Sequence, residues 1–259
     1  MSLHQLGSAL ALPLTVLFSV QLGLAQARQP HGLPARASAN DYAAHVQVGD
    51  VTYAASLLSP DQVKHTFAFD VSKMYLVFEV AVYPGGSSTA PVPLDPKGFV
   101  IGVGRGDVVH RADAVTVASV IQQKNLPKPS SREGSVVAST EVGYESGTDP
   151  YTGRRVHGTY TDTQVGVGTG RDNGPTAYPR SGGYPQDRQL LEDQLWDKSL
   201  PENKILRATA GYIYFPISLL KKQPNGLYTL EYLGPQSEDE SDSSAPFQKV
   251  ELRVPLKKH

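Results

Sequence analysis

Histidines are the side chains in this sequence best suited to hold a metal ion or transfer a proton, but their spacing supports neither role. Beyond His4, six histidines are scattered along the chain: His31, His45, His65, His110, His157 and His259. No two of them lie four residues apart, and the metalloprotease pattern H-E-x-x-H is absent. A zinc site would need ligands from distant loops. We therefore predict no metal site and interpret His65 as part of a strand face beside Phe67.

A glycine-rich stretch at residues 102–107, GVGRGD, suggests two binding motifs. It lacks the G-x-G-x-x-G spacing of a dinucleotide site, and no long helix is predicted after it. Its last three residues, Arg105-Gly106-Asp107, match an adhesion tripeptide at a hairpin tip. Because three-residue motifs arise by chance, we interpret the stretch as an ordinary glycine turn. The similar run at 166–172 is interpreted as a second flexible tip.

Other catalytic and ion-binding patterns find little support. The acidic run at residues 238–242 lacks the alternating ligands and the glycine of a calcium loop, and we interpret it as a solvated hairpin tip. No G-x-S-x-G is present, so a serine-hydrolase elbow is unsupported. Spacing alone does not distinguish the paired carboxylates of a glycosidase from surface acids. We predict no catalytic residue and no cofactor.

Tyrosines within a stretch rich in Gly, Ser, Thr and Arg are the most suggestive group for binding. They are Tyr144, Tyr151, Tyr160, Tyr178 and Tyr184. Rigid aromatic side chains among small residues are typical of contact surfaces, because a tyrosine is ordered at little entropic cost. The more ordinary interpretation is that these tyrosines pin the stretch to the rest of the fold. Both interpretations stay open, and the five tyrosines are our candidate binding residues.

The composition restricts the classes of function. The chain has 259 residues and a formal net charge of −1, so it lacks the excess of positive charge that nucleic-acid binding requires. It contains no cysteine, which excludes disulfides, thiol nucleophiles and cysteine-ligated metal centres. With 24 glycines and 20 prolines it is rich in turns, as β proteins with short strands are.

The N-terminus has the pattern of a secretory targeting segment. Residues 6–24 are mostly apolar, and the A-Q-A sequence that ends at Ala27 fits a cleavage site. The opening MSLHQ lacks Lys and Arg, which departs from the usual pattern. An uncleaved membrane anchor is the alternative, but internal prolines and glycines make a poor span. We predict a signal peptide over 1–27, a flexible leader over 28–40, and a bacterial protein that is secreted or periplasmic, with no stable membrane span after cleavage.

Alternating apolar residues predict a β-rich fold. The clearest pattern is YLVFEVAVY at Tyr75–Tyr83, where the even-numbered residues are apolar on one face, and it predicts a strand in the middle of a sheet. Further strands or strand pairs are predicted over 45–54, 63–71, 99–109, 205–215, 227–233 and 249–256. About eight strands with many turns are typical of a β-sandwich or barrel.

Two segments have helical spacing. Asp113–Lys124 begins with a good N-cap, and although alternate residues also fit a strand, we favour a short helix. Asp187–Lys198 is the clearest helix, because Leu191 and Leu195 lie four residues apart and Pro201 follows its end. These are the one or two short helices that we expect in the fold.

A long Gly/Ser/Tyr-rich insertion separates the two helices at residues 126–187. Leucine, isoleucine and phenylalanine are absent from 127 to 189, so the insertion can bury little apolar surface of its own. Loops of this length in compact domains are usually functional or disordered. We predict an excursion from the core that is partly disordered or forms a surface arm.

Four stretches carry a resemblance to a known family. Tyr75–Val82 matches a strand of the form y-v-v-v-e-v-t-v, and Leu94–Phe99 matches the element l-d-p-s-d-f; Gly211–Pro216 and Tyr228–Tyr232 are similar to two later elements. The family is that of secreted bacterial immunoglobulin-like domains of unknown function, which includes an immunoprotective extracellular protein of mycobacteria. The resemblance implies export, an immunoglobulin-like sandwich and an undefined binding or envelope role. It offers no catalytic residues.

The sequence thus predicts an all-β fold: a single immunoglobulin-like β-sandwich domain over 41–259. The leading functional hypothesis is an exported, non-catalytic protein that binds an envelope or extracellular protein or serves the envelope, with no nucleic-acid partner. The alternative is an exported hydrolase with an active site built from loops. A cluster of carboxylates or histidines in one cleft would favour the hydrolase.

Overall fold

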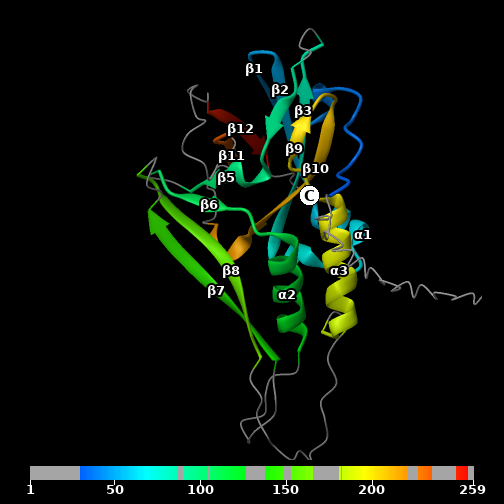
Figure 1. Ribbon diagram of the computed structural model, residues 1–259, viewed down its shortest axis with the longest axis vertical. Helices are drawn as coiled ribbons and strands as arrows, with labels where there is room; N and C mark the ends of the chain where they lie inside the picture. Colours follow the sequence, from blue (N-terminus) through cyan, green and yellow to red (C-terminus); the bar gives the residue numbers. More distant parts are fainter. Residues whose placement is uncertain are drawn as a thin grey trace, which may run out of the picture.

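The computed structural model describes residues 30–86, 90–103, 106–126, 138–148, 153–165, 181, 183–220, 227–234 and 249–255. The predicted signal peptide and the acidic run at 238–242 lie outside these ranges. Figure 1 shows the strands beside a layer of helices, with a long ribbon that projects from them, and the strands form sheets of four, six and two strands. None of the helices in the described ranges has the length and apolar character needed to cross a membrane.

The first sheet contains four antiparallel strands in the order β1, β2, β3, β10. Their bounds are Ala44–Val48, Val51–Leu57, Tyr75–Pro84 and Thr209–Pro216. β1 and β2 form the predicted hairpin, and Gly49 supplies the positive φ of 57° that its tight turn needs. β3 lies between β2 and β10, which confirms the predicted central strand.

The second sheet contains six strands in the order β12, β11, β5, β6, β8, β7. Their bounds are Val250–Pro255, Leu227–Tyr232, Phe99–Gly102, Val108–His110, Arg155–Val165 and Ala138–Thr148. Neighbouring strands are antiparallel except β6 and β8, which are parallel. The predicted strand over 205–215 is broken in two, because β9 (Asn203–Ile205) pairs with the short strand β4 (Val92–Leu94) before β10 begins.

The inner faces of the two sheets bury one shared hydrophobic core. Phe78 of β3 is fully buried, and its ring centroid lies 6.2 Å from that of Tyr228 in the other sheet. Tyr232 of β11 contacts Tyr53 of β2 at 5.4 Å and Phe99 of β5 at 4.4 Å, again between ring centroids. Each sheet therefore covers the apolar face of the other. The prediction of a β-rich fold is confirmed.

Three α-helices cover the opposite face of the four-stranded sheet (Figure 1). They are α1 (Pro60–Thr66), α2 (Ala114–Asn125) and α3 (Pro185–Lys198), and the 3-10 helices are η1 (Ala39–Asp41), η2 (Val71–Lys73), η3 (Pro96–Gly98) and η4 (Ile217–Leu219). The outward side chains of β3, Tyr75 and Val77, are buried against this layer. α2 and α3 confirm the two predicted helices, so the described part of the chain has one α-helix more than the sequence predicted.

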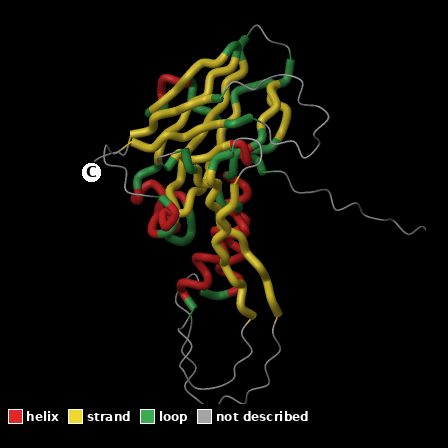
Figure 2. The backbone as a smooth tube through the Cα atoms, turned by 90° about the vertical axis from the view of Figure 1, so that its left-hand side faces the viewer, coloured by secondary structure: helices red, strands yellow, loops and turns green. Residues whose placement is uncertain are grey.

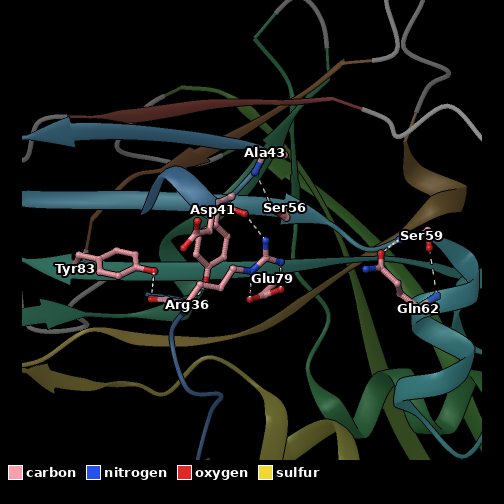
Figure 3. Close-up of polar contacts among 9 residues, drawn as sticks. Arg36, Asp41, Ala43, Ser56, Ser59, Gln62, Glu79 and Tyr83 are labelled. Carbon is pink, nitrogen blue, oxygen red and sulfur yellow. Dashed lines mark hydrogen bonds and ion pairs between the residues drawn. The ribbon is translucent and has the colours of Figure 1, made fainter. Parts of the chain in front are cut away.

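The additional helix, α1, replaces the strand that was predicted over 63–71, and that prediction is wrong. Ser59 and Gln62 form a capping box, in which the Ser59 hydroxyl accepts from Gln62 N at 3.3 Å and Gln62 Oε1 accepts from Ser59 N at 2.8 Å (Figure 3). Pro60 follows the cap, where its fixed φ suits a helix start. Phe67, the basis of the predicted alternation, caps the C-terminal end and is buried.

Residues 30–42 form a strap against the four-stranded sheet, although a flexible leader was predicted as far as residue 40. Leu33 N donates to Ala210 O at 2.7 Å and forms an isolated antiparallel bridge with β10. Leu33 also packs beside Tyr42, which is buried. The leader sequence looked featureless because it is rich in Pro, Ala and Ser, yet its contacts are with distant strands. Residues 28 and 29 lie outside the described ranges.

Arg36 fastens the strap to β3 (Figure 3). Its Nη2 lies 2.6 Å from Glu79 Oε2 and its Nε lies 3.1 Å from Glu79 Oε1, a bidentate geometry. The guanidinium also lies 4.3 Å from the ring centroid of Tyr42, and the Tyr83 hydroxyl donates to Arg36 O at 2.9 Å. The hydrogen bond to Glu79 raises the pKa of Arg36 further, against the effect of burial. The contact with Arg36 of the strap thus accounts for Glu79, the one charged residue in the otherwise apolar strand β3.

Replacing Arg36 with Met is expected to loosen the strap. The Glu79 side chain is 14% exposed and would lose its bidentate partner, so we expect unfolding free energy to fall by about 1–2 kcal/mol. Amide exchange at Leu33 should accelerate more than exchange at the centre of β3. The control is Lys73→Met, which removes a 72% exposed partner of Asp70. An unchanged exchange rate at Leu33 would contradict this account of the strap.

Candidate binding surface on the arm

β7 and β8 form an antiparallel ribbon, which we call the arm and define as residues 138–148 and 153–165. In β8, only Val156 and His157, which follow its first residue, pair with β6. The remainder of the arm extends beyond the other strands of its sheet (Figure 2). α2 packs against both strands, which gives the ribbon support that an isolated hairpin lacks. The predicted insertion over 126–187 therefore contains a regular ribbon, and its last three residues belong to α3.

β7 is an edge strand of the six-stranded sheet. It has 11 residues, about twice the usual strand length, and no strand in the described ranges pairs with its outer edge. Along an edge strand, alternate backbone amide and carbonyl groups point away from the neighbouring strand and are open to pairing with another chain. Residues 144–148 of β7 are all exposed. The arm thus presents a long strand edge at the surface.

The two arm tyrosines among the predicted binding residues lie on opposite faces of the ribbon. Tyr144 of β7 is 60% exposed and pairs with Thr159, whereas Tyr160 of β8 is 48% exposed and pairs with Gly143. Because residues opposite each other share a face and successive residues alternate, these two tyrosines do not form one surface. The ring of Tyr160 lies across Gly143, where any larger residue would collide with it.

The other predicted tyrosines do not join either face of the arm. Tyr184 is the N-cap residue of α3 and is partly buried, and Tyr151 and Tyr178 lie outside the described residues. Tyr144 accepts a hydrogen bond from Ser218 Oγ at 3.5 Å, which places its hydroxyl beside η4. Burial, and then the proximity of Tyr144, raises the pKa of Tyr75. Part of the Tyr144 surface is therefore used within the fold.

A group of four charged residues, which we call the clasp, joins the base of the arm to β11 and β12 of its sheet. It consists of Arg154, Glu231, Lys249 and Glu251. Glu231 is the second-last residue of β11 and is only 5% exposed. Arg154 Nη1 lies 2.6 Å from Glu231 Oε2, and Arg154 Nη2 lies 3.4 Å from Oε1. Lys249 Nζ lies 3.1 Å from Glu231 Oε2 and 2.8 Å from Glu251 Oε1, so it bridges two carboxylates on paired strands.

Two glycines allow the clasp to form. A Cβ atom at Gly102 of β5 would lie 2.8 Å from Glu231 Oε1, so the absent side chain leaves room for the carboxylate. Gly106, at the tip between β5 and β6, has a φ of 91°, and its carbonyl accepts from Arg154 Nε at 2.6 Å. Arg154 therefore holds three segments together: the start of β8, the β5–β6 tip and β11.

Two residues of the tripeptide Arg105-Gly106-Asp107, Gly106 and Asp107, form contacts beside the clasp. Arg154 Nε donates a hydrogen bond to the Gly106 carbonyl, and His157 Nε2 lies 4.0 Å from Asp107 Oδ2. Val103 N donates to Asp107 O at 2.8 Å, which closes the tip. This geometry agrees with the interpretation of an ordinary turn at this point, while Arg105 itself lies outside the described residues.

The Lys249–Glu251 contact is expected to make stability depend on acid pH. The hydrogen bond and charge of Lys249 hold the pKa of Glu251 below its ordinary value of 4.5 in the folded state. This stabilisation is present above the ordinary pKa and is lost as the pH falls through the lowered one. Between about pH 5 and pH 3, the Glu251→Gln variant should therefore lose less stability than wild type. The difference should be below about 1 kcal/mol, because Glu251 is half-exposed. Denaturant unfolding at each pH measures the loss of stability. Equal losses in Glu251→Gln and wild type would contradict the prediction. The matched control is Glu145→Gln, on the arm.

Sequence reasoning missed Arg154 and Glu231 as a pair, although a signal was present for one of them. Glu231 is the single acidic residue in the strand LYTLEY, where a charge in a core strand predicts a partner. Arg154 lies 77 positions away in the polar insertion. Among the described residues, no group of three or more His, Asp and Glu side chains is placed to hold a metal ion.

Comparison with protein-family models, with curated proteins and with solved structures gave no match for this chain.

Proposed function

We propose that this chain is an exported, non-catalytic protein with an immunoglobulin-like β-sandwich body, and that it binds an envelope or extracellular protein through the outer edge of β7. The shared core between two sheets supports a sandwich. The resemblance of the β3, β10 and β11 sequences to the secreted family supports an immunoglobulin-like type. Export rests on the apolar segment at 6–24 and the cleavage pattern that ends at Ala27.

The observation that carries this proposal is the position of β7. Long exposed edge strands are a hazard for soluble proteins, because they pair with other chains, and natural folds usually shorten or cover them. Here the strand lies on an arm outside the body, supported by α2 and held at its base by the clasp. Main-chain pairing to such an edge is an established mode of peptide recognition. The arm is thus built as a supported strand that a partner can extend.

The non-catalytic part of the proposal rests on how the buried and half-buried charges are used. Glu231 is paired with Arg154 and Lys249, and Glu79 is paired with Arg36. These contacts account for two carboxylates that would otherwise be candidates for acid–base chemistry. The hydrolase alternative remains testable: hydrolysis of a glycoside or ester panel that is lost on Glu231→Gln would favour it.

Proline substitutions at consecutive β7 positions test the edge. Backbone amides of a strand alternate between its two neighbours, so Tyr144→Pro and Glu145→Pro each remove an amide from a different side. We expect one variant to lose a bond to β8 and to melt at lower temperature. The other should keep the wild-type melting temperature and lose the protein captured from an envelope fraction.

Two side-chain variants complete this experiment. Tyr144→Ala and Tyr160→Ala leave the backbone edge intact, so both should still capture the partner, with at most a several-fold weaker affinity. The opposite result would be partner capture by the stable proline variant and no capture by one of the Tyr→Ala variants. That result would replace the strand-edge proposal with the aromatic contact surface that the sequence suggested.

A further inference from the structure

A cleft of about 410 Å³ lies in the helical layer, and its lining residues lie outside β7. It is bounded by the turn before η2, by η2 itself and by the C-terminal half of α2. Phe69, Met74 and Ile121 supply apolar surface, and all three belong to or pack against the helical core. Its volume falls within the range of about 300–1,000 Å³ that is typical of small-molecule sites.

Three charged side chains line this cleft: Asp70, Lys73 and Lys124. Asp70 Oδ2 lies 3.6 Å from Lys73 Nζ, and Asp70 Oδ1 accepts from Ser72 N at 3.1 Å. Burial alone would raise the pKa of Asp70, but the hydrogen bonds from Ser72 and the charge of Lys73 lower it below its ordinary value. Asp70 is therefore ionised at neutral pH and balances the charge of Lys73.

Lys124 supplies a positive charge that is not balanced within the cleft. Its Nζ lies 2.9 Å from Met74 Sδ, a weak and uncharged acceptor. In the described ranges, no carboxylate lies within ion-pair distance of this ammonium group. The cleft thus combines an apolar wall with one net positive charge at its rim.

We propose that this cleft binds a small amphiphilic carboxylate, whose acidic group contacts Lys124 and whose apolar part lies against Phe69 and Ile121. The ammonium group gains a charged acceptor in place of the thioether, and the apolar wall is removed from water. Lys73 lies on the same rim, where Asp70 balances its charge. This site does not depend on partner binding by the arm.

Calorimetric titration with octanoate and with 1-octanol tests the proposal on the full mature chain. We expect octanoate to bind more tightly than octanol, because only octanoate carries the charge. Lys124→Gln should weaken octanoate binding by about fivefold at low salt and leave octanol binding unchanged. Lys64→Gln, on α1 and outside the cleft, removes the same charge and should leave both affinities unchanged.

Amide chemical shifts then locate the ligand. Octanoate should shift the amides of residues 68–74 and 121–125, and these shifts should shrink in Lys124→Gln. Equal affinity for octanol and octanoate, equal weakening by Lys64→Gln and Lys124→Gln, or shifts confined to other parts of the fold would each overturn the proposal. So would the absence of any octanoate binding at millimolar concentration.

Discussion

Replacing Arg154 with Met should lower the free energy of unfolding by about 3 kcal/mol. The substitution removes the bidentate partner of Glu231, a carboxylate whose side chain is only 6% exposed, and breaking a buried ion pair costs about 3–5 kcal/mol. We expect the lower end of this range because Lys249 remains 3.1 Å from Glu231. Arg154 also donates a hydrogen bond to the Gly106 carbonyl and so links β8 to the β5–β6 tip. Its loss should accelerate amide exchange at Val156 and His157, which pair with β6. Denaturant unfolding and hydrogen exchange measure the two effects.

Matched variants separate the clasp from a general loss of charge. Lys249→Met removes the cation whose side chain is 42% exposed, and we expect a cost below about 1 kcal/mol. The double variant Arg154→Met with Glu231→Met removes both charges of the pair and should recover much of the stability, because apolar replacements of a largely buried pair are often neutral. A double variant less stable than Arg154→Met alone, or an equal cost for Lys249→Met, would contradict the role of the clasp.

Phe78→Ala should have the second large effect, about 4 kcal/mol of unfolding free energy. Phe78 is fully buried in the shared core, and its ring contacts Phe215 of its own sheet and Tyr228 of the other sheet. Truncation leaves a cavity at the junction of the sheets, so the loss includes both transfer and cavity costs. Leu227→Ala, on β11 next to Tyr228, is the control because Leu227 is 41% exposed, and it should cost below about 1 kcal/mol.

The same variant tests whether residues 41–259 form one cooperative domain. The single tryptophan of the chain, Trp196, lies in α3 and packs against the helical core, so its fluorescence reports on the helical layer. Far-ultraviolet circular dichroism reports on the helices and sheets together. One domain predicts that both signals change at the same denaturant concentration in wild type and shift together in Phe78→Ala. Two separate transitions would contradict a single domain.

Local sequence patterns predicted the elements that have a clear apolar face or a clear helix cap. The alternation of Tyr75–Tyr83 predicted both the central position of β3 and its two faces, because each face meets a different apolar layer. The N-cap at Asp113 decided between helix and strand for α2, and its carboxylate accepts from Thr116 N at 2.6 Å. For α1 the wrong pattern was preferred: two phenylalanines suggested alternation, while the capping box from Ser59 to Gln62 determined the structure.

The arm and the strap were not predictable in this way. The arm lacks Leu, Ile and Phe, so no apolar face indicates its pairing, and its support comes from α2 and from Arg154. The opposite faces of Tyr144 and Tyr160 follow from the register of β7 with β8, which the sequence does not specify. The strap depends on Arg36 reaching Glu79, 43 positions away. Contacts of this kind have no local sequence pattern.

Hydrogen exchange of β7 in the presence of the captured partner tests the binding proposal most directly. In the free protein, the amides of residues 138–148 that bond to β8 should be protected, and those that point to the outer edge should exchange freely. Binding of a partner strand should protect the outward amides, with smaller changes elsewhere. Unchanged exchange along β7, with new protection on another surface of the protein, would contradict the proposal that the outer edge of the arm is the binding site.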